Sequence, residues 1–94
     1  MGFKYIVVQV GVDVKREWPI IFPDMLVHSQ MAETIKTHLM RNHKMTGRIV
    51  AAGTVSFFGG EVNCHGESET LEIESRGEED NSLIKMFDYL HGIV

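Results

Sequence analysis

The chain has 94 residues, of which 44% are hydrophobic and 23% are charged, and its formal net charge at pH 7 is −4. This length and composition predict one folded domain over residues 1–94 and exclude disordered and fibrous proteins. The single cysteine, Cys64, excludes a disulfide within the chain. No apolar run approaches the roughly 18 residues of a membrane span, and the start of the chain does not resemble a signal peptide. We therefore expect a cytoplasmic protein without membrane contact.

The charge is unevenly distributed along the chain. Residues 1–48 carry seven Lys or Arg and four Asp or Glu, a net charge of +3, whereas residues 49–94 carry two and nine, a net charge of −7. An acidic domain attracts nucleic-acid phosphates poorly, because that affinity is dominated by cations. Surfaces of opposite sign favour self-association or a charged partner, and an ordinary solvated surface is the simpler interpretation.

Alternating apolar residues predict a first β-strand over residues 3–13, which read FKYIVVQVGVD. A second strand is predicted over residues 18–22. Pairing Val12 with Trp18 keeps the apolar faces in register and leaves a short connecting loop. Because Pro19 cannot donate a hydrogen bond to a neighbouring strand, we expect the second strand at an edge of the sheet.

A helix is predicted to follow the second strand. Either Asp24 or Ser29 can start it, since each side chain can accept hydrogen bonds from the free amides of a first turn. The expected apolar stripe recurs at four-residue spacing: Val27, Met31, Ile35 and Leu39. The helix should end near Asn42.

Two strand-like runs then meet at Gly59-Gly60. Both central positions of the favoured two-residue turn need positive φ angles, which glycine adopts readily, so the pair predicts a β-hairpin. This turn places Val55 opposite Cys64 on an apolar face.

The inward-facing residues after the hairpin turn, Val62 and Cys64, have even numbers, whereas the apolar residues further on, Leu71 and Ile73, have odd numbers. One extra residue restores the match and sets Leu71 opposite Ile49, so we expect a bulge or small loop within residues 65–68. Gly66 is the natural residue for such an irregularity, because it adopts positive φ at no steric cost.

A second helix is predicted from residues 78–80, three acids that suit the first turn of a helix, with Gly92 as its stop. The element order is therefore ββαββα. We predict an α+β fold, with a four-stranded, mainly antiparallel sheet and two helices packed on one face. The other face of the sheet would stay free and would offer Tyr5, Val7 and Phe58.

A small group of polar and reactive residues forms the candidate site: Cys64, His65, Gly66, Glu67 and His28. A thiol and an imidazole can act as nucleophile and base, or as two soft metal ligands. Adjacent strand residues point to opposite faces, however, and no metal-binding motif completes the set. The simpler interpretation is that Cys64 is a small core residue, and no catalytic residue, metal ligand or cofactor is assigned.

A basic run without acids spans residues 36–48. Its candidate nucleic-acid contacts are Lys36, Arg41, Lys44 and Arg48. Basic residues near the end of a helix are also favoured by the helix dipole, and the run contains no aromatic residue for base stacking, so the structural interpretation is preferred.

Two stretches, IIFPDMLVHSQMA and CHGESETLEIESRGEED, are similar to small uncharacterised proteins encoded by bacteriophages and prophages. In that family, FPD-L-H-A and HG-S-SL-SR-ED patterns recur in the same order. The resemblance implies a bacterial host cytoplasm and a small accessory role, and it carries over no catalytic residue. Glu69 and Glu72 stand where the relatives are more neutral, so the resemblance carries over no shared binding role.

The sequence therefore favours a non-enzymatic phage or prophage accessory or protein-interaction protein. Its partner could be a second copy, giving a homodimer, or a host or phage protein, either of which would cover a free apolar face. Two alternatives remain open. One is a regulator that contacts nucleic acid through the basic run 36–48, and the other is a small enzyme or metal site around Cys64 and His65.

Overall fold

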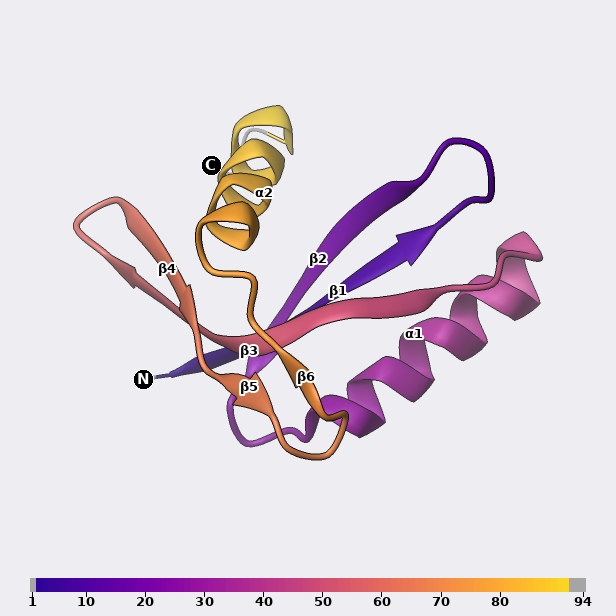
Figure 1. Ribbon diagram of the computed structural model, residues 1–94, viewed down its shortest axis with the longest axis horizontal. Coiled ribbons are helices and arrows are strands. Elements are labelled where there is room, and N and C mark those ends of the chain that lie inside the picture. Colours follow the sequence, from indigo (N-terminus) through magenta and orange to yellow (C-terminus); the bar gives the residue numbers. More distant parts are fainter. Residues whose placement is uncertain (1, 92–94) are drawn as a thin grey trace.

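The computed structural model describes residues 2–91 (Figure 1). Its elements, in chain order, are β1 (Phe3–Val10), β2 (Arg16–Pro23), α1 (His28–His43), β3 (Arg48–Phe58), β4 (Glu61–His65), β5 (Glu67–Ser68), β6 (Ile73–Glu74) and α2 (Glu78–His91). Four strands form an antiparallel sheet in the order β2-β1-β3-β4, and β5 pairs with β6 in a separate small sheet. The predicted α+β class and the ββαββα order are confirmed, with β5 and β6 as an addition.

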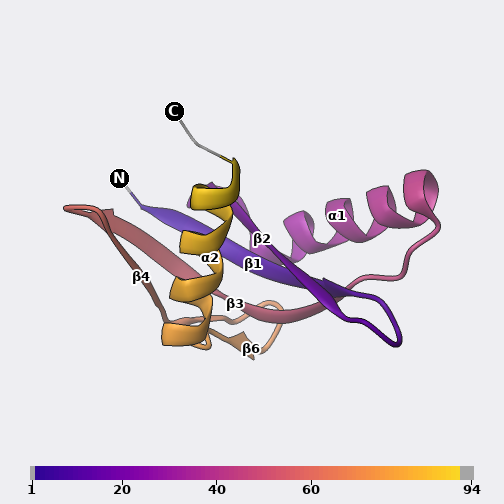
Figure 2. The same cartoon turned by 90° about the horizontal axis from the view of Figure 1, so that it is seen from above.

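The central strand β1 is buried on both of its faces. Ile6 and Val8 pack in a cluster that α1 covers, whereas Tyr5 and Val7 pack in a second cluster with Ile84 of α2. The two helices therefore lie on opposite faces of the sheet, and they are well separated in both views (Figures 1 and 2). The prediction that both helices share one face of the sheet is wrong. The other face, which was expected to stay free and to expose Tyr5 and Val7, is covered by α2.

The first hairpin has a different register from the predicted one. Val8, and not Val12, lies opposite Trp18. The strand ends early because Gly11 turns the chain with a φ of +103°, and a Cβ at this glycine would lie 2.2 Å from the carbonyl oxygen of Val14. Strand β2 does lie at an edge of the sheet, as predicted from its proline.

Helix α1 begins without a side-chain cap. Its N-cap residue is Val27, so neither Asp24 nor Ser29 fills the predicted role. The helix ends at His43, one residue beyond the predicted end, and Lys44 closes it in the left-handed conformation: the N–H of Lys44 donates to the carbonyl of Met40, and the N–H of Met45 donates to that of Leu39. The closing residue thereby turns the chain back toward the sheet.

The β3–β4 hairpin follows the sequence prediction closely. Gly59 and Gly60 have φ angles of +57° and +83°, and Val55 lies opposite Cys64. The irregularity expected within residues 65–68 is present as a break in the strand, because Gly66 has a φ of +81° and separates β4 from β5.

After this break the chain leaves the main sheet instead of extending it. Leu71 is not paired with Ile49, and the two residues meet only as members of the core cluster on the α1 side. The chain then returns past Gly53, where a Cβ would lie 2.5 Å from the carbonyl oxygen of His65 and 3.1 Å from the Cβ of Ser75. A glycine in β3 therefore allows the chain to cross from the α1 face to the α2 face.

Helix α2 starts with the three acids in its first turn, as predicted. The predicted stop at Gly92 lies outside the described residues. Within residues 2–91, neither helix combines the length and the apolar character needed to cross a membrane.

Candidate functional site

An apolar groove lies between α1 and the strands β1 and β2, and we call it the α1 groove. It has a volume of about 260 Å³ and is lined by Val8, Trp18, Ile20, Ile35, His38, Leu39, His43 and Met45. Trp18, Ile20, Ile35 and Met45 pack against the core but are only partly buried. The groove exists because α1 covers only part of this face of the sheet.

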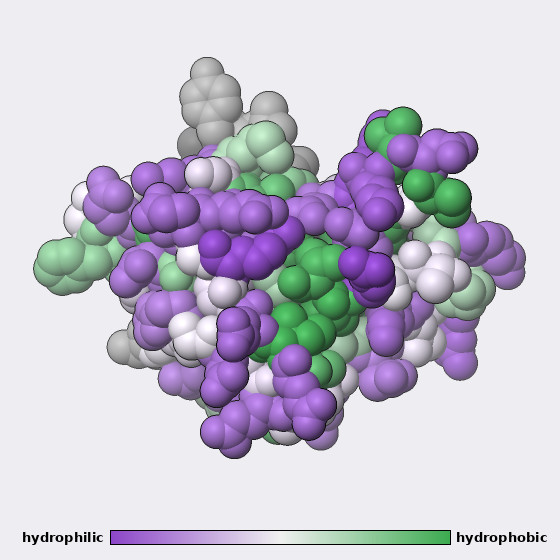
Figure 3. Space-filling view, in the orientation of Figure 1, coloured by the Kyte–Doolittle hydropathy of each residue, from purple (hydrophilic) through white to green (hydrophobic). Residues whose placement is uncertain are grey.

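A second hollow, of about 500 Å³, adjoins the groove toward the β1–β2 turn. It is lined by Gly11, Val12, Lys44, Met45 and Thr46, so Met45 belongs to both cavities. Val12 is 89% exposed. Figure 3 shows apolar surface at this turn, and a larger apolar patch over β3 and β6 within a hydrophilic surround.

Cationic and imidazole side chains surround the groove. The rings of His38 and His43 meet edge to face with centroids 5.5 Å apart, and Asn42 lies 2.8 Å from Nδ1 of His38. On the opposite rim, Arg16 precedes Trp18 by two residues in β2, so it lies on the same face of the strand. No carboxylate occurs between residues 34 and 48.

The predicted basic contacts do not form a single phosphate-binding patch on one element. Lys36 and Arg41 are exposed on α1, Lys44 caps the helix beside the groove, and Arg48 begins β3. Their common feature is position around the C-terminal part of α1.

The structure does not bring Cys64 and His65 together. Cys64 is buried on the α2 side of the sheet, whereas His65 is exposed and follows it in the same strand, so it points to the other face. Burial raises the pKa of the Cys64 thiol to about 11, and a neutral thiol is a poor nucleophile. This geometry favours the interpretation of Cys64 as a core residue.

His28 lies on the α1 side, across the sheet from Cys64. It is buried, its Nε2 lies 2.9 Å from the carbonyl oxygen of Gly53, and its ring packs edge to face against Phe22. His28 and Glu67 line one polar hollow of about 370 Å³ together with Lys4. Among the described residues, no group of three or more His, Cys, Asp or Glu side chains could hold a metal ion.

A buried polar network beneath α2 was missed by the sequence prediction. Asp80 is 0% exposed and accepts hydrogen bonds from the hydroxyl of Tyr5, from the backbone N–H of Arg76 at 2.8 Å and from Nε of Arg76 at 2.7 Å. The Tyr5 hydroxyl also contacts the hydroxyl of Ser75 at 2.6 Å. Burial, followed by the hydrogen bond to Asp80, raises the pKa of Tyr5.

The network continues to strand β2 through Arg76. Its guanidinium binds the carboxylate of Glu17, and these hydrogen bonds lower the pKa of Glu17. Among the described residues, every buried side-chain nitrogen and oxygen atom has a hydrogen-bond partner. Because its groups are satisfied internally, the network is a structural connection between β1, β2 and α2.

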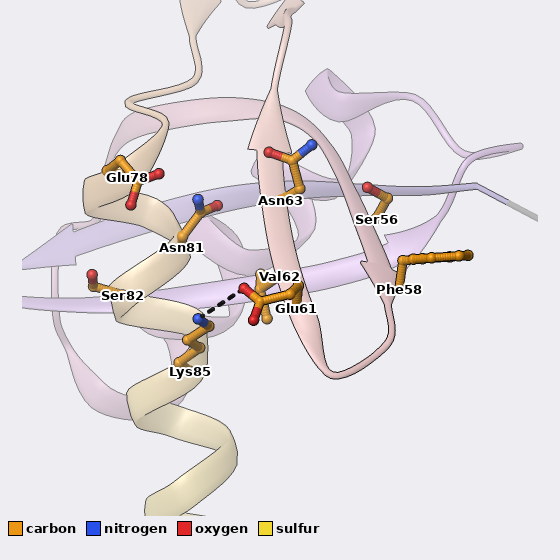
Figure 4. Close-up of a pocket in the computed structure, with 9 residues that line it drawn as sticks. All are labelled: Ser56, Phe58, Glu61, Val62, Asn63, Glu78, Asn81, Ser82 and Lys85. Atoms are coloured by element: carbon orange, nitrogen blue, oxygen red, sulfur yellow. Dashed lines mark ion pairs between the residues drawn. The ribbon is translucent and has the colours of Figure 1, made fainter.

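A second, polar cleft separates β4 from α2 and has a volume of about 430 Å³ (Figure 4). Lys85 reaches from α2 toward Glu61 of β4, with 3.5 Å between the charged atoms. Asn81 accepts a hydrogen bond of 2.6 Å from the backbone N–H of Cys64 and so fixes α2 to this edge of the sheet. Lys85 and Glu61 therefore pair across the cleft, and Glu78 adds a further carboxylate to its lining.

The two clefts differ in what they offer a ligand. The α1 groove presents apolar side chains to solvent, whereas the cleft of Figure 4 presents mainly polar ones. Comparison with protein-family models, curated proteins and solved structures finds no match to the chain. The resemblance to phage and prophage proteins stays a prediction.

Proposed function

We propose that this protein is a non-enzymatic interaction protein that binds a segment of another protein in the α1 groove. The observation that carries the proposal is the set of partly buried apolar side chains along the groove, Trp18, Ile20, Ile35 and Met45. Water contacts these side chains although they belong to the core cluster, and covering them would be favourable. The similarity of two stretches to phage and prophage proteins supports an accessory role in a bacterial host cell.

The size of the groove supports an interaction with a macromolecule. Pockets for small molecules usually enclose about 300–1,000 Å³, whereas the groove has about 260 Å³. A space of this kind suits one or two anchoring side chains of a longer segment, whose other residues lie on the rim.

A peptide-library selection against the immobilised protein tests the proposal. We expect enrichment of sequences that share large apolar residues at regular spacing. The same selection against Met45→Glu, which places a charge at the junction of the two cavities, should lose this enrichment. Met86→Glu is the matched control, because Met86 is a partly exposed methionine on the other helix.

Two outcomes of the selection are distinguishable. Enrichment shared by the wild type and Met86→Glu, and lost in Met45→Glu, supports binding in the α1 groove. If the wild type enriches no peptides beyond those that Met45→Glu enriches, binding in the α1 groove is contradicted, provided that circular dichroism shows both variants folded. Light scattering on the free protein answers the separate question of a homodimer, because a groove already filled by a second copy gives twice the monomer mass.

A further inference from the structure

We infer that the segment bound in the α1 groove is an acidic amphipathic helix of a different protein, an inference that rests on the proposed function. The floor of the groove and its rim have different chemistry. The floor consists of apolar side chains from α1, β1 and β2. Two cations flank this floor: Lys44, at the end of α1, lines the adjoining hollow, and Arg16 is exposed in β2 on the same strand face as Trp18. An occupant that matches both needs an apolar stripe flanked by carboxylates.

The charges near the groove are strongly one-sided. On the helix side, Lys44 lines the adjoining hollow, and no carboxylate lies between residues 34 and 48. On the strand side, Asp13 is the one acid of the β1–β2 turn and stands among Lys15 and Arg16. A basic or neutral segment would therefore bring its own charges against an uncompensated positive rim, whereas an acidic segment would neutralise it.

The edge strand favours a helical occupant over an added strand. Strand addition requires backbone donors along β2, and two of its eight residues, Pro19 and Pro23, have no N–H. The groove lies between a helix and a sheet, and it can receive residues that recur at three- and four-residue spacing on one face of a helix.

A second copy of the chain is a poorer match. Phe58, which is 86% exposed, stands at the tip of the β3–β4 hairpin with Glu61 beside it, so it could enter the groove of another copy. The tip and the groove are different surfaces, however, so this contact is head to tail, and it either closes a ring or continues as an open chain. An accessory protein that acts in a complex of fixed size is more consistent with a groove that binds a different protein.

Two synthetic peptides test the inference. Both carry the same leucine stripe at helical spacing, one with glutamate at every other position of the polar face and one with lysine there. Trp18 is the only tryptophan of the chain and lines the groove, so its fluorescence reports occupancy directly. We expect the glutamate peptide to shift Trp18 emission and to bind at least about ten-fold more tightly than the lysine peptide, with the difference shrinking at high salt.

Charge reversal on the protein is the decisive comparison. The double variant Arg16→Glu, Lys44→Glu should prefer the lysine peptide. Lys85→Glu, which reverses a cation beside the other cleft, should keep the wild-type preference. The reversed residues are all exposed, so the fold should tolerate each change.

The remaining outcomes each overturn the inference in a recognisable way. Equal affinities for the two peptides would contradict an acidic partner but would not contradict the proposed interaction function. Binding that does not change Trp18 emission places the segment elsewhere. Binding of neither peptide removes the acidic helix, and the library selection then decides the proposed function independently. A mass above that of the monomer that falls to the monomer value in Met45→Glu identifies a second copy as the occupant.

Discussion

Arg76 and Glu17 are 59 residues apart in the sequence, yet the guanidinium of Arg76 donates two hydrogen bonds, of 3.1 and 3.0 Å, to the carboxylate of Glu17. The same guanidinium binds Asp80 in the first turn of α2. One side chain thereby connects the edge strand β2 with the helix that covers the far face of the sheet. The stability of this face should depend on the network more than on any exposed ion pair.

Replacing Asp80 by alanine should destabilise the protein strongly. The change removes the buried carboxylate that the Tyr5 hydroxyl and the Arg76 guanidinium share, although Ser75 and Glu17 remain as partners, and breaking a buried pair in this way costs about 3–5 kcal/mol. Urea unfolding measures the loss. Glu79→Gln is the control, because Glu79 also pairs with Arg76 but is 65% exposed, and its removal should cost about 0–1 kcal/mol. Equal losses in the two variants would contradict the structural role of the network.

Stability should decline in acid partly through Glu17. Hydrogen bonds from Arg76 lower the pKa of Glu17 in the folded state. Its contribution is therefore complete above the unfolded pKa of about 4.3 and disappears as the pH falls through the lower folded value. Glu17→Gln should be less stable than the wild type at pH 7, and the difference should narrow below about pH 4. A difference that stays constant from neutral pH to pH 2.5 would exclude this linkage.

The Cys64 thiol should react slowly in the native protein. Burial raises its pKa to about 11, so only on the order of a thousandth of the thiol is ionised at pH 8. Iodoacetamide should label the denatured protein rapidly and the native protein slowly, as followed by mass spectrometry. Rapid native labelling would revive the hypothesis of a reactive pair with His65.

Gly53→Ala should be more damaging than a substitution in the hairpin turn. The new Cβ would lie 2.5 Å from a carbonyl oxygen of His65, which is backbone and cannot move aside cheaply, so a cost of about 1–3 kcal/mol is expected. Gly59→Asn is the comparison, because asparagine tolerates positive φ and nothing lies within 4 Å of the added Cβ. The melting temperature of Gly59→Asn should be higher than that of Gly53→Ala. The reverse order would contradict the close approach of the chain to Gly53.

Local features of the fold could be predicted from the sequence, since each depends on the conformation of a few neighbouring residues. The Gly59-Gly60 turn sets its own register, and Gly66 marks the break that follows. The first hairpin could not be placed in the same way. A shift of four residues keeps every side chain on the same face, so the apolar pattern fits Val8 or Val12 opposite Trp18 equally well.

The arrangement of the helices and the candidate site depends on contacts between distant parts of the chain. Four consecutive apolar residues of β1, beginning at Tyr5, do not reveal that a separate helix covers each face. The bond from Tyr5 to Asp80 spans 75 residues and has no local signal apart from an acid in the first turn of α2. The α1 groove is likewise invisible in the sequence, because it arises where the helix stops covering the sheet.

The burial of Tyr5 by a helix 75 residues later has a consequence during translation. Strand β1 leaves the ribosome before α2, and the residues that cover its second face follow at about 5–20 residues per second, a delay on the order of 4–15 s. For that interval, Tyr5 and Val7 belong to an uncovered apolar surface on a nascent chain.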